Sequence, residues 1–102
     1  MRNLHHPELK QVALSVVLHA LSDPVRLQIV RILDKHGESC CGGLELGLAK
    51  PTQSHHFKVL REAGVVSVRI EGTQRCLSLR KVDLDKRFPG LMDAVLKAKA
   101  PL

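Results

Sequence analysis

Three cysteines are the side chains with the most distinctive chemistry in this sequence. Cys40 and Cys41 are adjacent, and Cys76 lies much later in the chain. Thiolates are soft ligands, so they are candidates for binding a thiophilic metal or a metalloid such as As(III). Thiols are also oxidised reversibly to a disulfide or a sulfenic acid. A free cysteine is as often a small core residue without a chemical role. All three interpretations stay open at this point.

Basic side chains form a second group, concentrated in the second half of the chain. The net charge is +6, and residues 50–81 hold seven basic and two acidic side chains, or +5 of that total. A localised basic block indicates a polyanionic partner, usually nucleic acid, although a solvated basic surface gives the same count. Adjacent His55 and His56 would point in different directions on a helix. Since no Gly-rich phosphate loop or complete metal-hydrolase pattern is present, we do not expect an enzyme.

Length and composition are those of one small globular domain. The chain has 102 residues, of which 44 % are hydrophobic and 25 % are charged. Two Phe and no Trp or Tyr argue against base stacking on aromatic side chains, as single-strand binders use. No apolar run approaches the roughly 20 residues of a membrane span, and no signal sequence is evident. The odd number of cysteines gives no disulfide framework, so we expect a cytoplasmic protein.

These residues must be positioned by helices in the first half of the chain. A helix is predicted over residues 7–21, with apolar stripes on two sides. Such a helix needs two partners, and in so short a chain the second is expected to be another subunit. The next helix begins at Asp23, which suits the capping position before Pro24, and it ends at Gly37. One short turn is expected over residues 44–48.

The second half predicts a helix, a hairpin and a last helix. The first of these opens at Lys50, and Gly64 ends it. The apolar period then changes to two over residues 65–80, around a turn at Gly72, which predicts a two-stranded hairpin with a basic tip. A last short helix is expected over residues 90–99.

This order of elements is that of a winged helix-turn-helix domain, mainly α with a small β-hairpin in an α+β arrangement. One domain spans residues 1–102, with 1–21 as the N-terminal dimerisation helix, 50–64 as the recognition helix, 65–80 as the wing and 90–99 as the C-terminal helix. A recognition helix reads base edges in the major groove, and wing arginines reach phosphates or the minor groove. The candidate contacts with double-stranded DNA are Lys50, Thr52, Gln53, Ser54, His55, His56, Lys58, Arg69, Thr73, Gln74 and Arg75.

Four residues near this surface have structural alternatives. His56 is expected to be a packed, hydrogen-bonded residue as readily as a DNA contact. Arg26 is expected to be structural, pairing near Asp23 or Glu62. Arg61 and Arg80 are either part of the basic surface or ordinary solvated charges.

Three motifs occur in order across most of the chain: Asp-Pro-x-Arg from Asp23, Ser-x-His from Ser54, and Leu-Arg-Glu-Ala-Gly ending at Gly64. With the stretches that surround them, 20–30, 47–66 and 69–79, they make the chain resemble the arsenical-resistance repressor (ArsR/SmtB) family of bacterial winged-helix regulators. The resemblance implies a homodimer that represses by binding an inverted-repeat operator and leaves it when an effector binds. The first and last helices would form the dimer interface, with Leu9, Val12, Val16, Leu91 and Val95 as its expected residues.

The metal sites of that family are incomplete in this sequence. Cys40 occupies the first position of a Cys-x-Cys type site, but Gly42 stands at the second. The last helix offers Asp93 and no His for the other, interfacial type of site. In winged helices a short strand often precedes the recognition helix, which would bring Cys40 or Cys41 close to Cys76.

Cys76 falls on the polar side of its predicted strand, where we expect it to be accessible, and Arg75 beside it favours a thiolate. Metalloid binding and thiol oxidation that shifts the wing therefore both remain open.

Ala49 stands where a capping Ser is common in the family. Loss of that cap costs about 1 kcal/mol of stability unless another group replaces it. The alternative function is a winged-helix module that docks a partner protein through its apolar first helix.

Overall fold

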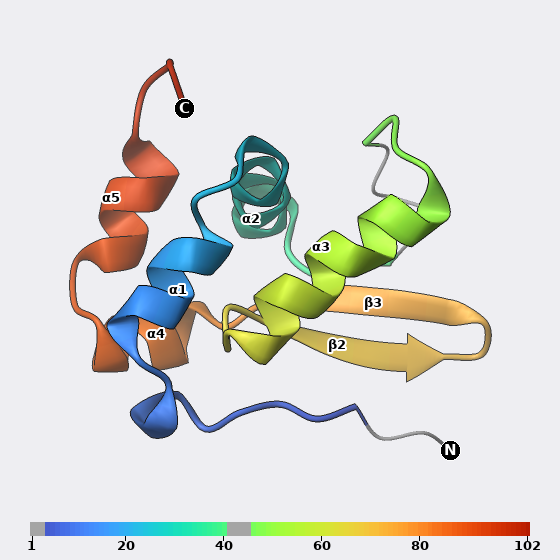
Figure 1. Ribbon diagram of the computed structural model, residues 1–102, viewed down its shortest axis with the longest axis horizontal. Coiled ribbons are helices and arrows are strands. Elements are labelled where there is room, and N and C mark those ends of the chain that lie inside the picture. Colours follow the sequence, from blue (N-terminus) through green and yellow to red (C-terminus); the bar gives the residue numbers. More distant parts are fainter. Residues whose placement is uncertain (1–3, 41–45) are drawn as a thin grey trace.

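The computed structural model describes residues 4–40 and 46–102, so Cys41 and the first two residues of the turn expected over 44–48 lie outside the described chain. A three-stranded antiparallel sheet, in the order β1-β3-β2, lies beneath a layer of helices (Figure 1). The mainly α architecture with a small β-hairpin is as predicted. The elements are η1 (Leu9–Gln11), α1 (Leu14–Ala20), α2 (Pro24–His36), β1 (Ser39–Cys40), α3 (Lys50–Glu62), β2 (Val66–Glu71), β3 (Gln74–Leu79), α4 (Lys81–Arg87) and α5 (Leu91–Lys97).

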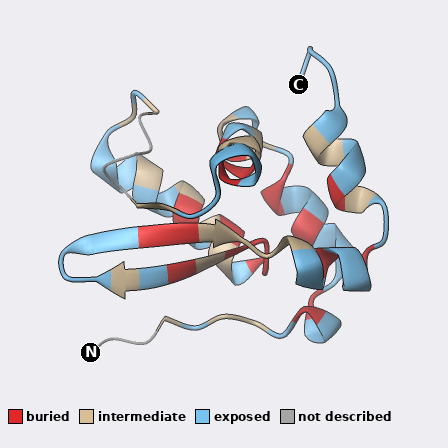
Figure 2. Ribbon diagram, turned by 180° about the vertical axis from the view of Figure 1, so that it is seen from behind, coloured by how far each residue is buried: buried red, intermediate tan, exposed pale blue. Residues whose placement is uncertain are grey.

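The core lies where α2 and α3 meet the base of the hairpin. Ile29 and Val30 from α2, Leu60 from α3 and Leu77 from β3 are fully buried. Figure 2 shows these buried segments at the centre of the molecule, while the hairpin tip is exposed along both strands. The fold therefore fixes the base of the hairpin and leaves its tip free to meet a partner.

The start of α2 is capped as predicted. Asp23 Oδ2 accepts hydrogen bonds from the backbone N–H groups of Val25 at 2.8 Å and Arg26 at 3.1 Å. Burial acts to raise the pKa of Asp23, but these two hydrogen bonds, together with the charges of Arg26 and His56, lower it below its usual range. Gly37, with φ +78°, ends the helix where the sequence predicted.

The junction of α3 with the hairpin also follows the prediction. Gly64 adopts φ +79°, its N–H donates to Arg61 O, and the N–H of Val65 donates to Leu60 O, which closes the helix with a Schellman motif. The strands pair from Val66 with Leu79 to Glu71 with Gln74, so Gly72 lies in a two-residue turn with φ +60°.

The prediction of a single helix over residues 7–21 is wrong, because this segment forms two separate elements, η1 and α1. Val12 and Ala13 are extended between η1 and α1. The Arg87 guanidinium donates to the carbonyls of Leu9 at 3.2 Å and Val12 at 3.3 Å, which a continuous helix would use for its own N–H groups. Leu9 and Val12 are consequently buried in the core of their own chain, whereas Val16 stays 45 % exposed.

Helix α4 was not predicted from the sequence. Leu84 in this helix and Phe88 directly after it, four residues apart, are both buried, and that spacing was the available signal. α5 follows close to its predicted place, and its buried residue is Met92, with no exposed surface. α5 packs against both α4 and α2, which sets the inward face of the helix.

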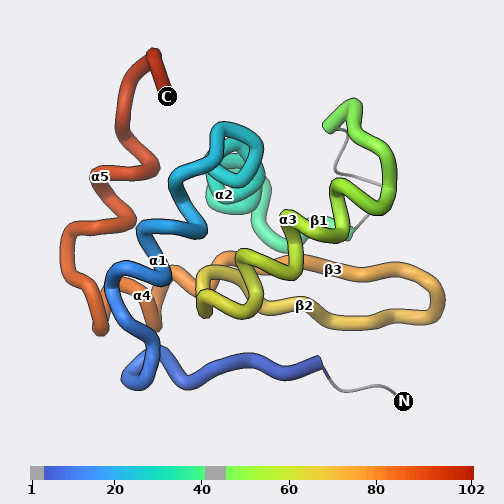
Figure 3. The backbone as a smooth tube through the Cα atoms, viewed as in Figure 1, coloured from blue at the N-terminus to red at the C-terminus, as the bar shows by residue number. Residues whose placement is uncertain are grey.

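The N-terminal segment lies along the outer edge of β2, as the tube in Figure 3 shows. The Val68 N–H donates to His6 Nε2 at 2.9 Å, Arg61 donates to the His5 carbonyl at 2.5 Å, and Arg80 donates to the Pro7 carbonyl at 2.9 Å. These contacts define the N-terminal strap, residues 4–8, and give both arginines a structural role.

The acceptor role of His6 requires a neutral imidazole. Burial lowers the pKa of His6, and the positive charges of Arg61 and Arg80 lower it further, against a hydrogen bond with the Leu4 backbone that raises it. The strap is therefore held best above the ordinary pKa of histidine. Among the described helices, none has the length and apolar character needed to cross a membrane.

Candidate nucleic-acid interface

The first half of α3 and the tip of the hairpin form the two walls of one groove. Its volume is about 400 Å³. The lining residues are Lys50, Gln53, Ser54 and Phe57 from α3 and Thr73, Gln74 and Arg75 from the hairpin. All of these lining residues except Phe57, six in number, were predicted from the sequence as DNA contacts, and they come from two elements that are distant in sequence. We call it the α3–wing groove.

Among the described residues, no carboxylate compensates the positive charge of this groove. No described acidic residue lines it, and Lys50, Lys58 and Arg75 form no ion pair within the described chain. A smaller adjoining groove of about 170 Å³ is lined by Lys58, Arg61 and Arg75, again with no acidic side chain from the described residues. The excess charge seen in the sequence is therefore concentrated on a concave, exposed surface, which suits a polyanion.

The outward side of α3 carries Thr52 and His55, both exposed. At the start of this helix, Ala49 gives no side-chain hydrogen bond to the first N–H groups, as anticipated from the sequence. The first N–H groups of a helix have no partner within the helix, and together with its dipole they favour an anion. The uncapped end thus adds to the positive character of the α3–wing groove.

His56 points away from this surface and packs against α2. Its Nδ1 lies 3.2 Å from Arg26 Nη1 and 3.9 Å from Asp23 Oδ2, and its side chain is 12 % exposed. Arg26 is buried and also donates to the carbonyls of Ala20 at 2.6 Å and His19 at 3.3 Å. Arg26 therefore joins the end of α1 to α3, and its partners do not include Glu62.

Arg69 is the wing residue whose environment differs most from the expectation of a free DNA contact. Its guanidinium pairs with Glu38 at 2.8 Å and with Glu71. The hydrogen bond from Arg69, followed by one from Ser78 at 3.1 Å, lowers the pKa of Glu38. Hydrogen bonds to Glu38 and, to a smaller extent, to Glu71 in turn raise the pKa of Arg69. Sequence reasoning missed Glu38, because nothing in the pattern showed that the residue before β1 would reach β2.

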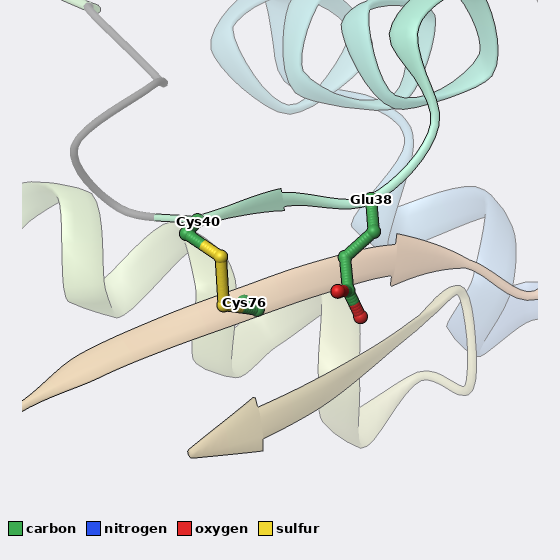
Figure 4. Close-up of side chains that lie close together, drawn as sticks. All are labelled: Glu38, Cys40 and Cys76. Carbon is green, nitrogen blue, oxygen red and sulfur yellow. A yellow bond between two sulfur atoms is a disulfide. The ribbon is translucent and has the colours of Figure 1, made fainter. Parts of the chain in front are cut away.

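Cys40 and Cys76 are joined by a disulfide between β1 and β3 (Figure 4). The predicted short strand is present, and it pairs Cys40 directly with Cys76. The expectation that Cys76 is accessible is wrong, because its exposed fraction is 1 %. Cys76 lies between Cys40 on β1 and Arg69 on β2, which are directly opposite it in the two neighbouring strands.

Glu38 lies beside this disulfide, and its carboxylate and the two sulfur atoms are all within 4.8 Å of one another (Figure 4). Two thiolates and a carboxylate form a mixed donor set for a thiophilic ion. With both sulfurs in the disulfide, however, no thiolate is available, so the oxidised site does not fit such an ion.

Comparisons with known proteins decide the family. Residues 23–68 match the family described as "Bacterial regulatory protein, arsR family". The chain is 38 % identical to an uncharacterised HTH-type transcriptional regulator, YceK of Bacillus subtilis, over 78 % of this chain and 82 % of that protein. It is also 40 % identical to the arsenical resistance operon repressor of Staphylococcus xylosus, over 71 % of this chain and 70 % of the repressor.

The chain belongs to the ArsR family. The crystal structure of the transcriptional repressor BigR from Xylella fastidiosa matches this chain with a TM-score of 0.59 and 35 % identity, over 72 % of this chain and 84 % of the BigR chain. The match confirms the winged-helix fold of this ArsR-family protein, which is a DNA-binding transcriptional regulator.

Proposed function

We propose that this ArsR-family protein is a homodimeric cytoplasmic repressor that binds an inverted-repeat operator through the α3–wing groove. The observation that carries the proposal is the groove itself, whose walls bring Lys50 and Arg75, neither in an ion pair within the described chain, together with hydrogen-bonding side chains. Relatives with repressor names, including the transcriptional repressor SdpR of Bacillus subtilis at 36 % identity, support it. In a dimer the two grooves would read half-sites about one DNA turn, ~34 Å, apart.

The contact residues divide into two roles in this proposal. Thr52 and His55, exposed on the outer side of α3, reach base edges in the major groove. Lys50, Lys58 and Arg75 bind phosphates, helped by the uncapped start of α3. The remaining groove residues, Gln53, Ser54, Thr73 and Gln74, supply hydrogen bonds to either. His56 is assigned to positioning α3, because its ring is engaged with Arg26.

The dimer is proposed from the exposed apolar residues of α1. Leu14, Val16 and Leu18 are each between 45 % and 47 % exposed, on both sides of the stripe that α1 buries in its own chain. Leu91 and Val95 on α5 are partly buried and complete the expected interface. Leu9 and Val12, which were also expected there, are buried in the core of the single chain and are left out of the proposed contact.

Operator binding by two point variants tests the assignment. The purified protein is titrated onto duplex fragments of the region upstream of its own gene, and affinity is measured over a range of salt concentrations. His55→Ala should reduce the preference for the operator over unrelated duplex, because it removes a base contact. Arg75→Ala should weaken binding to all duplexes and reduce the salt slope by about 0.9 for each phosphate contact that is lost.

Lys97→Ala, an exposed lysine at the end of α5, provides the matched loss of charge and should bind almost as the unchanged protein does. If His55→Ala and Arg75→Ala both bind like the unchanged protein, neither the outward side of α3 nor the α3–wing groove is the DNA surface. A monomer in sedimentation with no affinity for duplex would favour the protein-interaction module instead.

A further inference from the structure

The short strand β1 and the residue before it are held to the wing by contacts of unequal strength. β1 contains only Ser39 and Cys40, so it contributes little backbone pairing to the sheet edge. The Glu38–Arg69 ion pair beside it is largely exposed, with 40 % and 53 % of the side chains accessible, and such pairs add little stability. The Cys40–Cys76 disulfide is the covalent link, and it is the contact that fixes this segment against β3.

The disulfide and the ion pair occupy the same face of the sheet. In the hairpin register Cys76 is directly opposite Arg69, and Ser78 is two residues further along β3 on that face. Glu38 bridges these neighbours, accepting hydrogen bonds from Arg69 at 2.8 Å and from Ser78 at 3.1 Å. Closing the disulfide therefore places the Glu38 carboxylate on the wing.

That placement changes the charge of the wing. With Glu38 and Glu71 both on Arg69, the cluster carries one positive and two negative charges, or a net −1. Without Glu38 the cluster is neutral, and one N–H edge of the Arg69 guanidinium is open to another acceptor. A phosphate oxygen is such an acceptor, because Arg binds phosphates as it binds carboxylates.

We propose that Cys40 and Cys76 form a thiol–disulfide switch that controls operator affinity by placing Glu38 on Arg69 in the oxidised state. Oxidised protein binds the operator weakly, because each wing carries the extra carboxylate. Reduced protein binds it tightly, because the segment containing Glu38 separates from β3 and Arg69 takes a phosphate contact. This inference rests on the proposed repressor function, and in the proposed cytoplasmic location a disulfide is more often a redox sensor than a structural link.

The oxidant is a low-molecular-weight disulfide, and the step balances by thiol–disulfide exchange. The half-buried Cys40 is the more accessible sulfur, and its thiolate attacks the external disulfide, forming a mixed disulfide and releasing one thiolate. The Cys76 thiolate then attacks Cys40 Sγ and releases the second. Two protein thiols lose two electrons and their two protons, and the external disulfide gains them as two thiols.

The test compares operator binding by the full chain after treatment with dithiothreitol or with glutathione disulfide. Alkylation should count three free thiols in the reduced protein and one in the oxidised protein. One additional phosphate contact per protomer steepens the salt slope by about 0.9, or about 1.8 for a dimer. The affinity advantage of the reduced protein should therefore shrink by about tenfold when salt rises from about 50 mM to about 200 mM.

Three variants distinguish the switch from a disulfide that only stabilises the fold. Cys76→Ser should bind like reduced protein under both treatments. Glu38→Gln should keep the disulfide by thiol count but bind, when oxidised, like reduced protein. Asp83→Asn is the matched control, since it removes the same charge from the Arg80 ion pair away from the wing, and it should keep the full redox response. Glu38→Gln keeps the proposal testable if Cys76→Ser does not fold.

Four results of the operator-binding assay would contradict the switch and leave the repressor proposal intact. For the unchanged protein, these are equal operator affinity of the two redox forms and tighter binding by the oxidised form. For the variants, they are an unchanged redox response in Glu38→Gln and loss of the response in Cys41→Ser. Release of reduced protein from the operator by arsenite, with all thiols remaining reduced, would assign the sulfurs to metalloid sensing instead. Failure of both redox forms to bind any duplex would instead contradict the proposed function itself.

Discussion

Gly64 joins α3 to the hairpin, and replacing it with Ala tests how that junction is built. Its φ of +79° lies in the left-handed region, where a Cβ costs about 1–2 kcal/mol. The added Cβ would also overlap Leu9 Cδ2 and lie 3.4 Å from Leu9 Cγ, and Leu9 is buried. Displacing that packed side chain adds about 1–3 kcal/mol. We therefore expect Gly64→Ala to lower the free energy of unfolding by about 2–5 kcal/mol.

Gly90→Ala supplies the matched control. Gly90 has a similar φ of +85°, but a Cβ there would meet no described atom within 4 Å. It should cost only the conformational part, about 1–2 kcal/mol. In a Leu9→Ala background the clash is relieved, so Gly64→Ala should then cost about the same as Gly90→Ala.

Urea unfolding followed by circular dichroism measures these differences, because the chain has no Trp or Tyr for fluorescence. All variants are compared at one protomer concentration, since dimerisation makes apparent stability depend on concentration. Equal losses for Gly64→Ala and Gly90→Ala, or an unchanged cost of Gly64→Ala beside Leu9→Ala, would refute the packing argument.

Three further predictions concern the strap, the cap and the dimer. Because the pKa of His6 is lowered in the fold, the unfolded chain takes up the proton first, and stability should fall as pH drops below about 6.5; His6→Gln, measured by urea unfolding at several pH values, should flatten that slope, and an equal slope would contradict the strap. Asp23→Ala should cost about 1 kcal/mol and Asp23→Asn much less, since Asn also caps helices, and equal losses would rule out capping as the cause. Val16→Glu should give monomers in sedimentation while Val82→Glu, on α4, stays dimeric, and two dimeric variants would place the interface elsewhere.

Local sequence signals predicted the parts of the fold that depend on local chemistry. Asp23 before Pro24, Gly64 after an amphipathic helix and Gly72 between alternating strands each fixed a boundary that the structure confirms. The break at Val12 could not be predicted in this way, because its cause is the side chain of Arg87, distant in sequence.

The candidate site shows the same division between local and tertiary causes. Lys50 and Arg75 were identified from the concentration of basic residues in this part of the sequence, and they line one groove. Arg69 was grouped with them because its carboxylate partner Glu38 belongs to another element. The burial of Cys76 likewise depends on β1, a strand of two residues that pairs across the chain, which strand periodicity alone does not reveal.

Backbone amide chemical-shift changes on adding operator duplex test the central claim most directly. Uniformly ¹⁵N-labelled protein is titrated with the duplex, and the change in each amide signal is mapped onto the chain. The proposed interface predicts the largest changes at residues 52–58 in α3 and 72–75 at the wing tip. Changes concentrated instead on α5, or around Arg31 on α2, would show that DNA binds another face and would contradict the assignment.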